Sequence, residues 1–207
     1  MRKEHFRRKV MKNCSKNYNW SLKCYLIIFI SKGTIIGVKK EVNCMNIQKF
    51  TQKSIEAINN CEKIAYDYGN QEIDQEHFLY SLMTIEDSLI ANLIEKMNID
   101  KDIFLKNIEQ LLNQKNKVSG DVKLYISNDL NKVLVNAEDE AKRMGDSYVS
   151  VEHLMLALIA APNRAIKQLF KTYGINRESF LSVLATVRGN QTVTSDNPEA
   201  TYDTLNK

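Results

Sequence analysis

The sequence predicts an all-α protein in which two tandem four-helix repeats pack as one eight-helix domain about a pseudo-twofold axis. A twelve-residue phrase occurs twice, as YDYGNQEIDQEH over residues 66–77 and as KRMGDSYVSVEH over residues 142–153. The same interval of 76 residues matches apolar or small residues, without a gap, from Phe50 to about Arg188. Within each copy the apolar residues recur every three or four positions, which is typical of amphipathic helices, and no segment alternates as a strand does.

The first repeat, residues 45–113, is predicted to hold four helices. The first begins near Phe50 and stops at Gly69, because glycine adopts the left-handed conformation of a helix C-terminus at little cost. The starts of the next three helices are indicated by side chains that can accept a hydrogen bond from a free helical N–H group. They belong to Asp74 for the second helix, to the cluster of Glu86, Asp87 and Ser88 for the third, and to Asp100 for the fourth.

The second repeat, residues 126–188, follows a polar connector at 114–125 and has the same plan. Gly145 is predicted to end its first helix, and Ser150 takes the helix-capping place of Asp74. Pro162 interrupts the chain before the third helix, since proline is tolerated only in a first turn. Gly174 is predicted to end that helix before the fourth one begins.

The charge is divided unevenly along the chain. Residues 1–44 hold eleven Lys or Arg against two Glu, a net charge of +9, whereas residues 45–207 hold eighteen against twenty-three Asp or Glu, a net charge of −5. Because the repeats have no surplus of positive charge to neutralise phosphates, nucleic acid is not an expected partner. The four cysteines form no C-x-x-C pair, and this usage favours a reducing cytoplasmic compartment.

Residues 1–44 share no pattern with the repeats. Their apolar run at 24–30 is interrupted by Lys32 and is too short for a membrane span, which takes about 20 apolar residues. We interpret this extension as a disordered tail or as sequence upstream of a natural start at Met45, with an amphipathic membrane anchor as the alternative. For the repeats themselves no membrane partner is expected.

The motifs that would carry chemistry are absent from the sequence. None of the seven glycines lies in a phosphate-binding motif, so the chain is not predicted to be an enzyme or to bind a nucleotide cofactor. His77 and His153 each follow a glutamate at equivalent places. We expect each histidine to pack or to form a hydrogen bond in the first helical turn, and a metal site shared by the two is the less favoured alternative. Cys61 lies on an apolar stripe and is interpreted as a core residue.

Residues 45–207 resemble the N-terminal Clp repeat domain of the Hsp100 unfoldases. The resemblance rests on MNIQKFTQKSIEAI at 45–58, YGNQEIDQEHFL at 68–79 and YVSVEHLMLAL at 148–158. The last stretch, VRGNQTVTSDNPEATYDTLNK at 187–207, favours the ClpB type of disaggregase over the ClpA and ClpC types.

The resemblance implies a domain that binds unfolded or aggregated proteins in the cytoplasm. In the full-length family, AAA+ rings then use ATP to disaggregate them, as a homohexamer that cooperates with the DnaK system. Residues 189–207 are accordingly predicted to be a linker toward an AAA+ module that this chain lacks. The alternative is an adaptor-docking domain of the ClpC or ClpA type.

The resemblance also implies a set of substrate-binding residues. By motif match the polar positions are Thr51, Asp146 and Glu152, although these can equally serve as a helix cap, a turn residue and a partner of the helix dipole. An apolar groove at the seam between the repeats is expected to include Phe50, Leu134 and Val151.

Overall fold

The structure is a computed structural model that describes residues 47–118, 123–189 and 191–196. The chain divides into two compact units, Met1–Glu41 and Val42–Lys207, and every described residue belongs to the second unit. The interpretation of residues 1–44 therefore lies outside the described residues, as does the predicted linker beyond residue 196.

Eight α-helices form most of the described part of the chain, which confirms the predicted all-α class. The first repeat holds a short 3₁₀ helix η1 (Ile47–Lys49) and the helices α3 (Gln52–Asp67), α4 (Gln75–Thr84), α5 (Leu89–Lys96) and α6 (Lys101–Gln114). The second repeat holds α7 (Asn128–Met144), α8 (Val151–Ala160), α9 (Arg164–Tyr173) and α10 (Arg177–Arg188).

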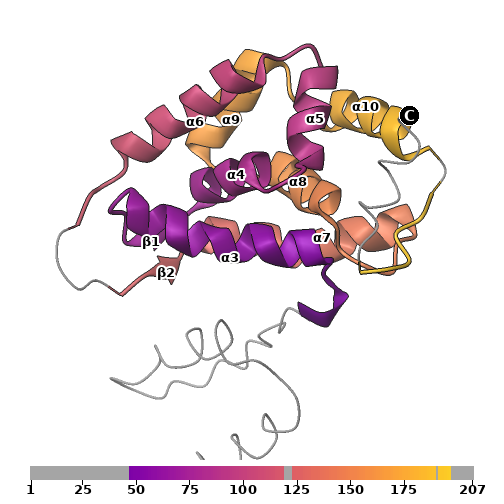
Figure 1. Ribbon diagram of the computed structural model, residues 1–207, viewed down its shortest axis with the longest axis horizontal. Coiled ribbons are helices and arrows are strands. Elements are labelled where there is room, and N and C mark those ends of the chain that lie inside the picture. The colour runs from indigo at the N-terminus through magenta and orange to yellow at the C-terminus, as the bar shows by residue number, and fades with distance from the viewer. Residues whose placement is uncertain (1–46, 119–122, 190, 197–207) are drawn as a thin grey trace, which may run out of the picture. The chain divides into compact units, whose positions relative to one another are not determined.

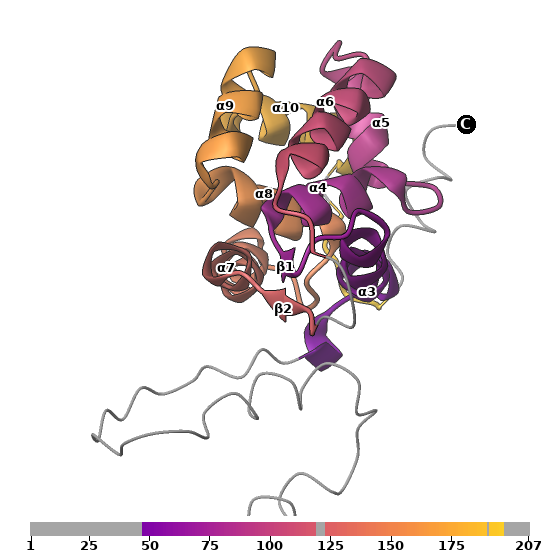
Figure 2. The same cartoon turned by 90° about the vertical axis from the view of Figure 1, so that its left-hand side faces the viewer.

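The helices of the second unit lie in three layers (Figure 1). Helices α3 and α7 form one outer layer, α4 and α8 lie in the middle, and α5, α6, α9 and α10 form the other outer layer, as the turned view also shows (Figure 2). Helix α4 contacts α8 directly, and each also contacts the first helix of the other repeat. The two repeats therefore share one core.

The helix boundaries have the local causes that the sequence predicts. Asp74, Ser88 and Asp100 each accept a hydrogen bond from an N–H group of the first turn of α4, α5 or α6. Gly145 and Gly174 have positive φ angles of 74° and 66° and end α7 and α9 in the left-handed conformation. Such a φ angle is strained for residues that carry a Cβ atom.

Two short segments pair as strands, although no strand was predicted. Strand β1 (Glu72–Ile73) of the first repeat pairs in parallel with β2 (Tyr125–Ile126), which leads into α7. At positions 76 residues away, Val149 forms a parallel bridge with Phe50, which leads into α3. Segments of two residues are too short to show alternation in the sequence, and the all-α class holds.

These two pairings share one hydrogen bond that is equivalent under the pseudo-twofold relation. The Ser127 N–H donates to the Ile73 carbonyl oxygen at 2.9 Å, and the equivalent Thr51 N–H donates to the Val149 carbonyl oxygen at 3.0 Å. Ser127 and Thr51 are also the N-caps of α7 and α3. Each repeat thus pairs the loop after its first helix with the segment that leads into the other repeat.

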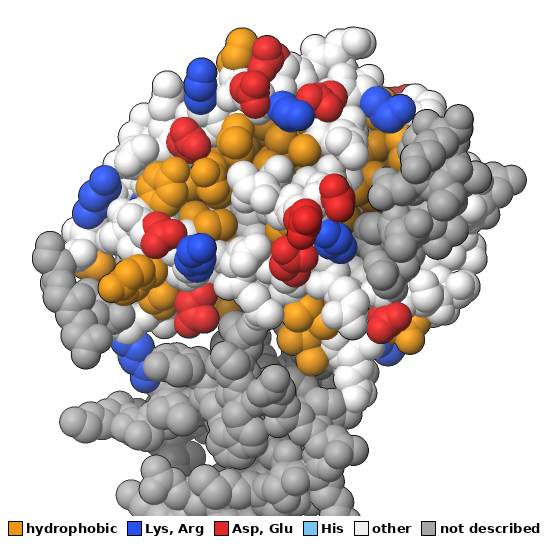
Figure 3. Space-filling model, in the orientation of Figure 1, with side chains coloured by type: hydrophobic (Ala, Val, Ile, Leu, Met, Phe, Trp, Pro, Cys, Tyr) orange, Lys and Arg blue, Asp and Glu red, His pale blue; other side chains and the backbone are white. Residues whose placement is uncertain are grey.

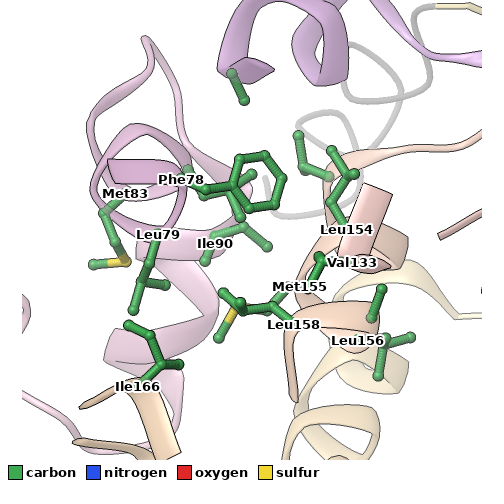
Figure 4. Close-up of a cluster of buried hydrophobic side chains, with 14 of the residues drawn as sticks. Phe78, Leu79, Met83, Ile90, Val133, Leu154, Met155, Leu156, Leu158 and Ile166 are labelled. Atoms are coloured by element: carbon green, nitrogen blue, oxygen red, sulfur yellow. The ribbon is translucent and has the colours of Figure 1, made fainter. Parts of the chain in front are cut away.

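The core is formed where the two helices of the middle layer, α4 of the first repeat and α8 of the second, meet. Figure 4 shows Phe78, Leu79 and Met83 of α4 facing Met155 and Leu158 of α8. On the outer layer, the ring of Phe104 on α6 meets Tyr173 on α9 edge to face, with ring centroids 5.0 Å apart. Aromatic contact therefore joins the repeats in addition to the aliphatic core.

We expect Phe104→Ala to lower the free energy of unfolding by about 3–5 kcal/mol, because it leaves a cavity between α6 and α9. Phe104 is fully buried, whereas its neighbour Ile103 is 53% exposed. Ile103→Ala is the matched control and should cost less than about 1 kcal/mol. Urea unfolding followed by circular dichroism measures both values, and equal effects of the two substitutions would contradict this packing.

Candidate substrate-binding site

All six residues predicted to bind substrate are buried. None has more than 9% of its surface exposed, and Thr51 and Glu152 have none. The six are Phe50, Thr51, Leu134, Asp146, Val151 and Glu152. Direct contact of these side chains with a ligand stays a prediction.

The structure places all of these residues except Leu134 around the N-terminus of α8. Phe50 and Thr51 run beside Val149, the loop residue that precedes the cap of this helix. Val151 and Glu152 are the first two residues of α8, and Leu134 lies on α7, the helix that packs most closely on α8. Thr51 is the N-cap of α3, which confirms the structural role considered for it.

Asp146 is the centre of a buried polar network at this place. Its Oδ2 atom accepts a hydrogen bond from His153 Nε2 at 2.8 Å, and its Oδ1 atom accepts one from the Val193 N–H at 2.7 Å. Arg188 Nη2 also donates to Oδ1, while Arg188 Nη1 lies 3.7 Å from Glu152 Oε1. One guanidinium therefore places a positive charge beside each of two buried carboxylates.

The bonds to Asp146 favour its charged form. Burial raises the pKa of this carboxyl, but the hydrogen bonds from His153 and Arg188 lower it more, so that the pKa falls to about 2. The Asp146 side chain has no exposed surface. It is therefore held as a buried anion at neutral pH.

The first repeat has an equivalent network with different residues. Asn70 takes the place of Asp146, and its Oδ1 atom lies 3.0 Å from His77 Nε2. Lys115, which follows α6, reaches Asp74 Oδ2 at 2.7 Å and Glu76 Oε2 at 2.9 Å. In both repeats a cation at the end of the fourth helix thus compensates the acidic start of the second helix.

His77 and His153 both act as helix-capping residues, as predicted. The Nδ1 atom of His77 accepts the Asp74 N–H at 3.0 Å, and that of His153 accepts the Ser150 N–H at 3.0 Å. Since Nδ1 accepts, the neutral ring carries its proton on Nε2. Burial, and after it the charge of Lys115, lower the pKa of His77 to about 4.

Among the described residues no three His, Cys, Asp or Glu side chains come together to hold a metal ion. Cys61 is buried and donates to the Ala57 carbonyl oxygen at 3.2 Å, and burial raises the pKa of its thiol. Within this part of the chain every helix is too short or too polar to span a bilayer.

Exposed apolar side chains are the feature that the sequence analysis missed. Tyr66 is 79% exposed, and Tyr125 and Val118 are exposed to a lesser extent. The backbones of Val118 and Tyr125 donate to the carbonyl oxygens of Gly69 and Gln71, in the loop that follows Tyr66. Further apolar side chains reach the surface over α4 and α6 (Figure 3). The exposure of Tyr66 could have been predicted, because this residue lies off the apolar stripe of α3.

The family follows from comparison with known proteins. The model of the Clp repeat (R) N-terminal domain matches residues 49–173. The chain belongs to this family. ClpB of Bacillus anthracis, a chaperone protein, is 40% identical over 167 residues, which cover 79% of this chain and 19% of that protein. The chain therefore spans about a fifth of the length of such relatives.

Solved structures of other Clp repeat domains share the fold. The Hsp104 N-terminal domain from Candida albicans has a TM-score of 0.63 and 23% identity, and the match covers 73% of this chain and 99% of that one. A complex of the ClpV N-domain with a VipB peptide has a TM-score of 0.57 and 17% identity, over 78% of this chain and 100% of that one. At these identities the likeness shows the fold only.

We expect the stability of this Clp repeat domain to fall as the pH is lowered from about 6.5 to 4. In that range the unfolded chain protonates His77, whereas the folded chain binds this proton only near its pKa of about 4. The unfolded state then binds more protons, so protonation favours unfolding by up to about 3 kcal/mol.

The control is His77→Gln, whose amide oxygen can accept the same Asp74 N–H bond. Urea unfolding between pH 7 and pH 4 should show the variant losing less stability than the wild type. Asp146 is present in both proteins, so its contribution to the pH dependence cancels in the comparison. Parallel pH profiles for the two proteins would contradict the assignment.

Proposed function

We propose that this Clp repeat domain is the substrate-recognition module of a ClpB-type chaperone and binds apolar segments of unfolded or aggregated proteins. The observation that carries the proposal is the 40% identity with ClpB over 167 residues. The folded residues present a shared core and several exposed apolar side chains, and no three His, Cys, Asp or Glu side chains among the described residues come together to hold a metal ion. These features suit a binding module.

The surface that we propose for binding surrounds the loop at 69–71 and includes Tyr66, Val118 and Tyr125. Aromatic side chains bury a large area at a small entropic cost, which suits weak binding of varied apolar segments. The six residues predicted from the resemblance would then support the seam between the repeats from within, because all are buried.

The activity of the whole machine is a further part of the proposal. In longer relatives of the ClpB type, AAA+ rings would use ATP to thread the captured protein in the cytoplasm, together with the DnaK system. A homohexamer would hold six such domains near one pore. Tethering weak sites in this way raises their effective concentration, so that each site needs only low affinity.

Docking of one dedicated adaptor, as for the ClpC or ClpA type, is the second candidate. A solved ClpV N-domain holds a VipB peptide, which supports peptide docking by this fold. A pull-down from cell extract separates the candidates. One stoichiometric partner favours the adaptor, and heterogeneous unfolded chains favour substrate capture.

We expect the double variant Tyr66→Ser, Tyr125→Ser to bind a fluorescent, reduced and unfolded model protein about threefold to tenfold more weakly than the wild type. Fluorescence anisotropy titration measures both affinities. Ile103→Ser is the matched control, because Ile103 is similarly exposed but lies at the start of α6. Unchanged binding by the double variant would reject this surface.

A further inference from the structure

The chain after α10 is packed on the domain. We name residues 191–196 the strap; it runs from the end of α10 past α7 toward the start of α3 (Figure 1). The N–H groups of Ser147 and Tyr148 donate to the Val193 carbonyl oxygen at 3.0 and 3.3 Å, and the Gln52 N–H donates to the Asp196 carbonyl oxygen at 2.9 Å. The Val193 side chain is fully buried.

Asp146 joins the strap to the helices. Its Oδ1 atom accepts the N–H of Val193, while the same carboxylate binds His153 of α8 and Arg188 of α10. Arg188 Nε in turn donates to the Gln191 carbonyl oxygen at 2.6 Å. The strap is thus fixed at one end by a charged side chain whose other partners all belong to the folded helices.

The first repeat shows why a carboxylate is needed here. Asn70, the equivalent of Asp146, has an amide group that donates to the Asn116 carbonyl oxygen at 3.2 Å. The groups that surround Asp146 are instead all donors, and only a carboxylate can accept from all of them. Bonds to a charged acceptor are also stronger than bonds to a neutral amide.

We propose that Asp146 is a positioning residue that clasps the strap, so that its loss releases residues 191–196 while the eight helices stay folded. The strap buries a single apolar side chain, and segments with few buried contacts open at a lower free energy than the whole domain. The clasp therefore sets whether residues 191–196 stay packed on the helices. This inference is independent of the proposed function.

Hydrogen exchange measured by NMR on the full chain tests the clasp with Asp146→Asn. The amides of Gln52, Ser147, Tyr148 and Val193 should exchange about tenfold to a hundredfold faster, because each is bonded to the strap or to the clasp. The amides of Thr51 and Val149 serve as internal controls. Their acceptors lie outside the strap, so their exchange rates should stay unchanged.

Two further variants complete the test. Val193→Ser removes the apolar anchor and should accelerate the same amides with the clasp intact. Asn70→Ala is the matched control in the first repeat. It should accelerate exchange of the Val118 amide, whose N–H donates to the carbonyl oxygen of Gly69, the residue before Asn70. The four amides that are bonded to the strap or the clasp should stay protected.

Three results would overturn the proposal. One is equal acceleration of all amides in Asp146→Asn, or complete unfolding of that variant, since Asp146 would then support the whole domain. Another is fast exchange, in the wild type, of the four amides that are bonded to the strap or the clasp. The third is unchanged protection of these amides in Asp146→Asn, because the strap would then be held without the clasp.

Discussion

Each repeat depends on the other for a backbone segment that it does not supply itself. The loop of the first repeat binds the segment that leads into α7, and the loop of the second binds the segment that leads into α3. These bonds place Thr51 and Ser127 where they cap their helices. A four-helix unit of this size buries little apolar area, so the reciprocal pairing and the shared core between α4 and α8 stabilise both halves together.

The same frame carries two different polar networks. The first repeat compensates Asp74 and Glu76 with Lys115, which leaves the chain free to continue into the connector. The second compensates Asp146 and Glu152 with Arg188 and adds the N–H of Val193. The two repeats thus share this backbone geometry, while the side chains of the second repeat also hold the segment that follows it.

The sequence was sufficient for features that depend on local spacing. The 76-residue interval, the cap at Asp74 and the left-handed turn at Gly145 all follow from residue types at fixed positions. Features that join distant residues could not be predicted. In the sequence, Phe50 and Val149 look like members of two separate apolar stripes of helices, and nothing marks them as a pair. Val193 is buried although it lies in a polar segment. The ion pair between Asp146 and Arg188 spans 42 residues and leaves no pattern.

The mutual dependence of the repeats is tested most directly by separating them. Residues 45–118 and 123–207 can be produced as two chains and examined by circular dichroism during urea unfolding. The structure predicts that each chain has little helix and no cooperative transition, and that mixing them in equal amounts restores both. A single repeat that unfolds cooperatively, with the stability of the intact domain, would contradict the account.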